Sequence, residues 1–205
     1  LYTYWLYDYA GVNPQNGNAL WRNEEGLLTE NYGEARRINA GSPEPLWTGG
    51  FNTELSWRGI SLGIQLEARY GNKVLNQDRS LFEADGSYGD SNIWKGAMNY
   101  WKKPGDTNVL PKPVYNNSSN SSAISTRYLE DGSYLRIKDI TLAYSLPSKW
   151  TKKALMSGVR IYASALNLYT FHNMNYWDPE HGTSGVTIIS YPMTRSMIVG
   201  VDITF

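Results

Sequence analysis

The alternation of side chains over the last stretch of the chain, from Tyr191 to Phe205, constrains the fold most strongly. Its sequence is YPMTRSMIVGVDITF, and every second residue counted back from the end is apolar. The apolar set is Met197, Val199, Val201, Ile203 and Phe205. A period of two predicts a β-strand with one apolar and one polar face. A soluble domain gains little from a long unpaired final strand, whereas a closed transmembrane barrel pairs it and turns its apolar face towards lipid.

The same alternation recurs earlier in the chain. Residues 48–58 and 60–70 both alternate, and the Arg58-Gly59 dipeptide at their junction predicts a tight hairpin turn. Residues 126–146 and 159–171 also read as strands. In the first of these the apolar phase slips by one residue at Asp139, which predicts a β-bulge. With the aromatic-rich, strand-like start of the chain (residues 1–9), about six strands are expected.

Long and short connections alternate along the chain. Residues 10–46, 71–125 and 172–190 read as long loops, whereas Arg58-Gly59 and the helical or turn connector at 147–158 are short. Such asymmetry is typical of outer-membrane barrels, whose short turns lie on the periplasmic side. Several strands reach the roughly 9–11 residues that cross a bilayer. The predicted fold is therefore all-β: an arc of an antiparallel transmembrane β-barrel, because about six strands are too few to close one.

Composition excludes several other classes of protein. Lys and Arg together number 19, as do Asp and Glu, so there is no net basic charge to indicate nucleic-acid binding. Cysteine is absent, which excludes disulfides and thiolate metal sites. The sequence contains no run of about 18 apolar residues, so it predicts no transmembrane helix. Tyr (16) and Trp (8) outnumber Phe (4), as expected for membrane-interface belts or sugar-stacking loops.

Six runs of sequence are distinctive: YLEDGSYLRIKDITLAYSLP (128–147), RIYASALNLYTF (160–171), WDPE (177–180), the closing YPMTRSMIVGVDITF, and upstream YAGVNPQNGNALW (9–21) and PLWTGGF (45–51). Together these runs resemble the SusC family of TonB-dependent transporters. The resemblance covers nearly the whole chain, with the runs in the family's order.

This resemblance implies that residues 1–205 form the carboxyl-terminal part, about the last six strands, of a barrel of about 22 strands. The plug domain and the TonB box of such proteins would lie outside this chain. It further implies a cell outer-membrane protein that imports a glycan or oligosaccharide, or in some members an oligopeptide. The implied partners are a SusD-like surface lipoprotein and the energising TonB complex. The alternating ending with Val201, Ile203 and Phe205 resembles the signal recognised by the barrel-assembly machinery.

The polar side chains of the strands are predicted to face the barrel lumen. They are Glu54, Arg58, Glu67, Arg69, Arg136, Lys138, Arg160 and Asp202. The main interpretation is a solvated or ion-paired wall packed against the plug; the alternative is that some of them contact substrate. The opposite, apolar set would face the outer-membrane lipid.

Aromatic residues in the loops are the candidate substrate-binding residues, because flat rings stack on the apolar faces of sugars. They are Trp94, Trp101, Tyr115, Tyr176 and Trp177. The alternative is that they pack the loops together or contact the SusD-like partner. A second aromatic set is expected in the membrane-interface girdles: Trp5, Tyr7, Trp57, Tyr70, Tyr144 and Trp150.

The chain shows little sign of other chemistry. The spacing of His172 and His181, with Asp178 and Glu180 between them, fits no known metal signature. Asp85, Asp90 and Asn92 lack the ligand spacing of a calcium loop. No carboxylate pair, phosphate-binding loop or nucleophile elbow indicates an enzyme, and no cofactor is expected. A soluble β-sandwich or carbohydrate-binding module would show the same alternation, but strand length, the terminal Phe205 and loop asymmetry favour the barrel.

Overall fold

The computed structural model describes residues 2–87, 92–115, 117, 119–180, 184–189 and 191–205. The chain forms two compact units. The first, here called the loop unit, comprises residues 1–44, 73–131 and 181–190. The second, the sheet unit, comprises residues 45–72, 132–180 and 191–205. Each unit is therefore assembled from segments that lie far apart in the sequence.

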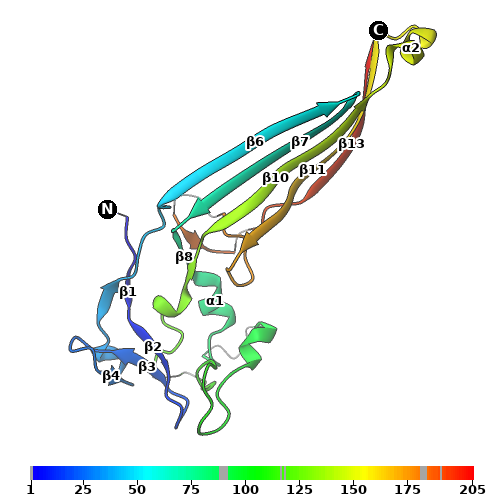
Figure 1. Cartoon of the computed structure of the whole chain (residues 1–205). Helices are drawn as coiled ribbons and strands as arrows, with labels where there is room; N and C mark the ends of the chain where they lie inside the picture. Colours follow the sequence, from blue (N-terminus) through cyan, green and yellow to red (C-terminus); the bar gives the residue numbers. More distant parts are fainter. Residues whose placement is uncertain (1, 88–91, 116, 118, 181–183, 190) are drawn as a thin grey trace. The chain divides into compact units, whose positions relative to one another are not determined.

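The sheet unit is built on one antiparallel sheet of five long strands (Figure 1). These are β6 (Trp47–Trp57), β7 (Ile60–Tyr70), β10 (Tyr134–Ser145), β11 (Gly158–His172) and β13 (Ser196–Thr204). Their order across the sheet is β13-β11-β10-β7-β6, so β6 and β13 form its edges. The strands predicted at 48–58, 60–70, 159–171 and the closing stretch are confirmed, and their antiparallel pairing is as expected.

The turns and irregularities of this sheet follow from local sequence. Arg58 and Gly59 both have positive φ, 49° and 90°, which suits a two-residue hairpin turn between strands with a right-handed twist. The predicted bulge is confirmed, because the register of β10 against both neighbours shifts between Ile137 and Asp139. On the β11 side, Asn167 takes a left-handed conformation (φ 50°) where the register shifts. The predicted connector contains α2 (Ser148–Thr151) and the 3₁₀ turn η4 (Lys152–Ala154).

The loop unit contains three small sheets and short helices. In the first sheet, β1 (Trp5–Tyr7) pairs with β5 (Arg37–Asn39). In the second, β3 (Ala19–Arg22) lies between β2 (Tyr9–Val12) and β4 (Leu28–Thr29). In the third, β8 (Lys73–Asn76) pairs with β9 (Leu129–Asp131) and, in parallel, with β12 (Val186–Thr187). The helices are α1 (Gln77–Phe82), η1 (Tyr32–Glu34), η2 (Lys95–Met98) and η3 (Thr126–Tyr128). Within the described ranges, no helix has the length and apolar character needed to cross a membrane.

Two sequence expectations are corrected by the loop unit. The start of the chain does not add a sixth strand to the long sheet: it forms β1 and part of β2, and Tyr4 and Leu6 join a buried cluster with Leu75 and Tyr128. The strand expected over 126–146 is interrupted after β9, and only β10 belongs to the long sheet. Short strands that pair locally and pack on their own core lack the long alternation that identified the sheet strands.

The hairpin turn between β6 and β7 yields a first prediction. A Cβ on Gly59 would lie 2.8 Å from the Ser145 carbonyl oxygen, and its φ of +90° disfavours any side chain. We expect Gly59→Ala to reduce the free energy of unfolding by at least about 1 kcal/mol. Gly158→Ala is the control, because nothing lies within 4 Å of its Cβ position. The thermal transition of the full-length protein measures the effect; equal transitions for both variants would contradict this account of the turn.

Candidate functional site

One face of the long sheet is predominantly apolar. Residues directly opposite each other in an antiparallel sheet share a face, so the register identifies rows of side chains that cross all five strands. One row is Leu55, Leu62, Leu142, Ala163 and Val199; the next is Thr53, Ile64, Ile140, Ala165 and Met197. These are the residues whose alternation predicted an apolar face, and the structure places them together.

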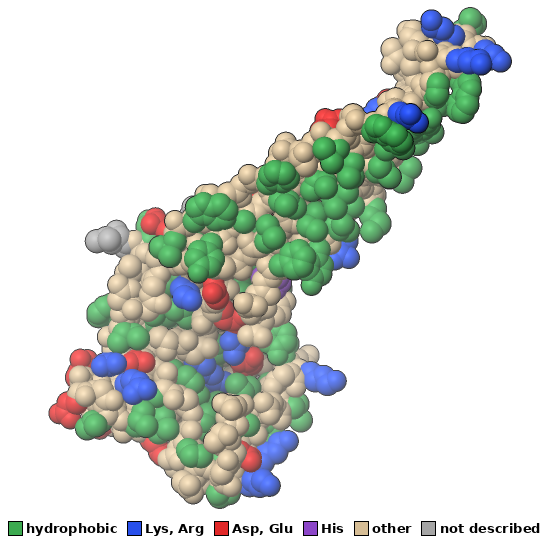
Figure 2. All heavy atoms as spheres, in the orientation of Figure 1, with side chains coloured by type: hydrophobic (Ala, Val, Ile, Leu, Met, Phe, Trp, Pro, Cys, Tyr) green, Lys and Arg blue, Asp and Glu red, His purple; other side chains and the backbone are tan. Residues whose placement is uncertain are grey.

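This apolar face is exposed rather than packed against a core. Leu55, Leu142 and Val201 are more than half exposed, and Val199 is 79% exposed. Figure 2 shows hydrophobic side chains gathered along the long sheet. Contiguous exposed apolar patches larger than a few hundred Å² mark interaction or membrane surfaces. A surface of this kind needs an apolar environment.

Aromatic side chains flank the aliphatic rows at both ends of the sheet. Trp47 and Tyr70 are paired at one end, and Trp57 and Tyr144 lie in the same row at the other. Strand β6 has 11 residues, and at about 3.3 Å per residue its end-to-end length is about 33 Å. At the strand tilt of about 35–45° found in outer-membrane barrels, this length projects to about 23–27 Å, close to their apolar band of about 25 Å.

The predicted girdle residues divide between the two units. Trp57, Tyr70, Tyr144 and Trp150 are all exposed in the sheet unit. Trp5 and Tyr7 lie instead in β1 of the loop unit, where Tyr7 contacts Tyr32 at a ring-centroid distance of 4.7 Å. Only four of the six residues predicted in the girdles therefore belong to the sheet unit, and their place at a membrane interface stays a prediction.

The polar face of the sheet is organised around Arg136. This side chain is fully buried (0% exposed) and its three guanidinium nitrogens are all bonded. Nη2 lies 2.5 Å from Asp178, Nη1 lies 2.7 Å from Glu180, and Nε donates to the Thr170 hydroxyl at 2.9 Å. The loop that follows β11 is thereby tied to β10. The sequence placed Asp178 and Glu180 near possible metal ligands, but here they bind an arginine.

Further charges extend this network along the polar face. Lys138 pairs with Glu67 at 3.1 Å and with Glu180 at 3.5 Å. The Tyr134 hydroxyl donates to Glu67 at 2.8 Å, and Arg69 lies 3.6 Å from the same carboxylate. The polar face of the sheet is thus ion-paired; that it lines a barrel lumen stays a prediction.

The remaining residues predicted on the polar face are more exposed. Arg160 pairs with Asp202 at 3.2 Å across β11 and β13, and Glu54 lies opposite Gly63 on β6 and β7. Arg58 differs from the expectation: it lies in the hairpin turn, and its guanidinium covers the Trp57 ring at 4.8 Å. The turn takes Arg58 out of the strand alternation on which its predicted direction depended.

Two of the five predicted ligand-contacting aromatics line a cavity in the sheet unit. Tyr176 and Trp177 border a volume of about 430 Å³ together with His172, Asp178 and Arg195. Tyr176 is exposed and has a left-handed backbone (φ 68°). Aromatic rings beside a few polar groups are typical of small-ligand sites; that Tyr176 and Trp177 contact substrate stays a prediction.

The other three predicted aromatics lie in the loop unit. Trp94 stacks on Phe82 with ring centroids 4.9 Å apart. Trp101 is only 8% exposed and donates its indole N–H to the Pro14 carbonyl at 3.0 Å, so it packs the loops together. Tyr115 is exposed. The five residues therefore do not form one platform within either unit.

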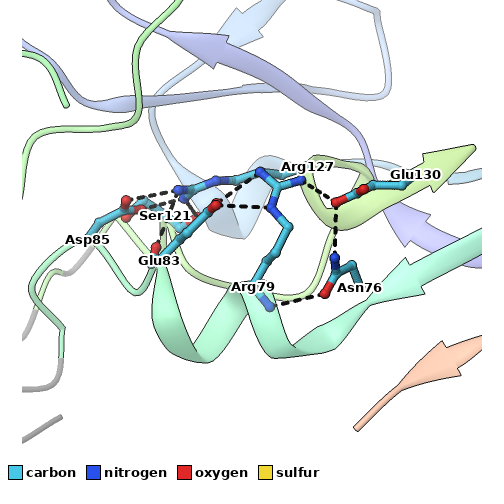
Figure 3. A network of polar contacts seen from close by, with 7 residues as sticks. All are labelled: Asn76, Arg79, Glu83, Asp85, Ser121, Arg127 and Glu130. Carbon is cyan, nitrogen blue, oxygen red and sulfur yellow. Dashed lines mark hydrogen bonds and ion pairs between the residues drawn. The ribbon is translucent and has the colours of Figure 1, made fainter. Parts of the chain in front are cut away.

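A buried network of two arginines and three carboxylates organises the loop unit (Figure 3). Arg79 pairs with Glu83 at 2.9 Å and with Glu130 at 2.8 Å, and Arg127 forms a two-pronged ion pair with Asp85. Burial, the largest single effect, lowers the pKa of Arg127, but the hydrogen bond to Asp85 and the electrostatic interactions with Asp85, Tyr128 and Tyr9 together raise it above its ordinary value. Sequence analysis missed this network, although the four-residue spacing of Arg79 and Glu83 is a helical ion-pair signal.

No metal site is found in the described part of the chain, where no three His, Asp or Glu side chains form a suitable group. Asp85, considered above as a calcium ligand, instead binds Arg127. His181 and Asp90 lie outside the described residues.

The burial of Arg136 yields a second prediction. Arg136→Met leaves the Asp178 and Glu180 carboxylates without their main partner, and breaking a buried ion pair costs about 3–5 kcal/mol. We expect Arg160→Met to cost about 0–1 kcal/mol, because its pair with Asp202 is solvent-exposed. Thermal unfolding of the two full-length variants measures the difference. Similar losses for both would show that the buried network does not anchor the loop.

Comparison with known proteins identifies TonB-dependent receptors as relatives of this chain. No protein-family model matches the chain. It is 30% identical over 182 residues to the TonB-dependent receptor P3 of Formosa agariphila, covering 83% of this chain and 17% of that protein. It is 28% identical over 89 residues to the TonB-dependent receptor SusC of Bacteroides thetaiotaomicron, covering 43% of this chain and 9% of SusC.

A solved structure resembles this chain both in fold and in sequence. The structure of the RagAB peptide transporter matches 99% of this chain and 23% of the transporter chain, with a TM-score of 0.84 and 29% identity. The chain thus spans at most about a quarter of the length of these relatives. All of them are receptors or transporters, and none is an enzyme. On these matches and on the motifs of its own sequence, the chain is similar to a part of the TonB-dependent receptors, SusC among them.

Proposed function

We propose that this chain is part of the membrane-spanning wall of an outer-membrane transporter. Its five long strands are members of a closed barrel of about 22 strands, and residues 1–205 are the carboxyl-terminal part of that barrel. The observation that carries the proposal is the exposed apolar face with aromatic residues at both ends. In this arrangement the plug domain and the TonB box belong to the rest of the full-length protein.

The edges of the sheet support a closed barrel. Strands β6 and β13 each pair with one neighbour in the described residues, so each presents a free row of backbone N–H and C=O groups. In hydrocarbon, such groups must be paired, which a barrel achieves by adding neighbouring strands on both sides. Val201 and Ile203 lie in β13 and Phe205 directly follows it; in this proposal the three would serve as the barrel-assembly signal.

The transporter would import a nutrient oligomer actively. The relatives named as TonB-dependent receptors support a TonB complex as the source of energy, and SusC supports a SusD-like surface lipoprotein as the partner. The polar face would line the lumen, where the buried Arg136 network holds the loop after β11 in place.

Two substrate classes follow from two different observations. An oligosaccharide is our first assignment, because Tyr176 and Trp177 border a cavity with polar groups and aromatic rings stack on sugars. An oligopeptide is the second, because the RagAB peptide transporter matches 99% of this chain. Uptake of labelled oligosaccharides and oligopeptides by cells with and without the full-length gene distinguishes them.

A soluble β-sandwich explains the structure less well. A sandwich buries the apolar face of each sheet against a second sheet about 10 Å away. The apolar face of this sheet remains open, with Met197 and Val199 more than 70% exposed.

Fractionation of cells that express the full-length parent tests the proposal. We expect the protein in the outer membrane, with a gel mobility that changes on boiling because a closed barrel resists unfolding in detergent. A soluble protein without this change would refute the proposal.

Substitutions on neighbouring residues of β7 test which face meets lipid. Ile64 lies on the apolar face between the two aromatic ends, and Gln65 lies on the opposite face. We expect Ile64→Arg to cost about 2–4 kcal/mol of barrel stability, since a charge near the bilayer midplane faces lipid. Gln65→Arg is the matched control and should leave the barrel folded. The fraction of heat-modifiable protein in outer membranes measures both; greater damage from Gln65→Arg would contradict the assignment of faces.

A further inference from the structure

The connector between β10 and β11 concentrates positive charge at one end of the sheet. Lys149, Lys152 and Lys153 lie in α2 and η4 and are all exposed. The connector, residues 147–158, contains no acidic residue. Figure 2 shows Lys and Arg side chains gathered at the end of the sheet that carries α2. The charge cluster is therefore a surface feature, formed by one short element.

The spacing of these lysines is unfavourable for an isolated helical turn. Lys149 is three residues before Lys152 and four before Lys153, so the three ammonium groups project from neighbouring positions. Like charges at these spacings destabilise a helix. Among the described residues, no carboxylate forms an ion pair with any of the three. An external anion would remove this repulsion.

A fourth cation lies close to the start of the connector. Arg58, in the turn between β6 and β7, precedes Gly59, whose carbonyl accepts the Ser145 N–H at 2.7 Å. Ser145 is the last residue of β10, so the turn and the connector share this end of the sheet. Arg58 covers the Trp57 ring, and no carboxylate of the described chain forms an ion pair with it.

Large apolar side chains accompany the cations. Trp150 is exposed, and Leu155 is 89% exposed in a left-handed backbone conformation (φ 59°) at the end of η4. Trp57 and Tyr144 mark the adjacent end of the apolar face. Amphipathic aromatics beside lysines suit the layer where hydrocarbon meets charged headgroups, because lysine stems lie along apolar surface while their ammonium groups reach phosphate.

We propose that the connector, together with Arg58, is a binding surface for the headgroups of anionic glycerophospholipids. The lysine ammonium groups and the Arg58 guanidinium bind lipid phosphates, while Trp150 and Leu155 enter the boundary of the acyl chains. This inference rests on the proposed membrane-spanning function and adds a lipid preference to it. It also assigns this end of the sheet to the phospholipid leaflet of an outer membrane, rather than to a lipopolysaccharide leaflet.

Native mass spectrometry of the detergent-solubilised full-length receptor tests the proposal. The receptor is titrated separately with phosphatidylglycerol, phosphatidylcholine and lipopolysaccharide. The variant K149Q/K152Q/K153Q removes the cluster. The variant K102Q/K103Q/K112Q removes three exposed lysines of the loop unit and is the matched control. Heat-modifiable gel mobility verifies that each variant forms a barrel.

We expect the wild type and the control to retain phosphatidylglycerol in preference to phosphatidylcholine. Each basic residue near an anionic surface strengthens its attraction by about fivefold, so the connector variant should lose the preference by at least about tenfold. The preference should also weaken in about 0.5 M salt, where charges are screened within a few ångströms.

Two outcomes would overturn the inference while leaving the proposed function intact. One is a heat-modifiable wild type that retains both phospholipids equally. The other is a connector variant that keeps the phosphatidylglycerol preference or loses lipopolysaccharide instead. A wild type that is absent from the membrane fraction and retains no lipid would overturn the proposed function as well.

Discussion

The register of the five-stranded sheet is the constraint on which the rest of the structure depends. Because side chains alternate along a strand, a slip of one residue would exchange the two faces. The observed register aligns apolar residues across every strand, including through the bulge at Asp139, where β10 and β11 adjust together. The result is one apolar face, whose exposure to water is unfavourable, and one polar face, whose charged side chains form ion pairs. In the proposed barrel, lipid on one side and a hydrated lumen on the other would satisfy both faces.

The polar face of the sheet holds a loop through ion pairs rather than through an apolar core. Arg136 loses its contact with water, and three bonds to Asp178, Glu180 and Thr170 compensate for the loss. The loop that contains Tyr176 and Trp177 starts from β11 and is tied back to β10 by this arginine. Asp178, which binds Arg136, also borders the cavity beside these aromatics. In the loop unit, the Arg79 and Arg127 network plays a comparable part among short strands and loops.

Sequence reasoning succeeded where the signal was periodic. Strands β6, β7, β11 and β13, the Arg58-Gly59 turn and the bulge at Asp139 all follow from patterns that the printed sequence contains. It failed where the determining contacts are long-range. Arg136 binds two carboxylates that lie more than 40 residues away in the sequence, and Arg127 binds Asp85 at a similar sequence separation. No local sequence pattern predicts either contact. The short strands β3, β4, β5, β8 and β12 lie in ranges that the sequence predicts as loops, because two to four residues are too few to reveal alternation.

The central claim is that the apolar face of the sheet meets lipid, and accessibility along β7 tests it most directly. Single nitroxide labels placed at successive positions from Ile60 to Tyr70, in the full-length receptor in bilayers, report contact with oxygen dissolved in the hydrocarbon. The account predicts high oxygen accessibility at Ile60, Leu62, Ile64, Leu66 and Ala68, with low values at the positions between them. Uniform accessibility, or a maximum on the opposite set, would contradict it.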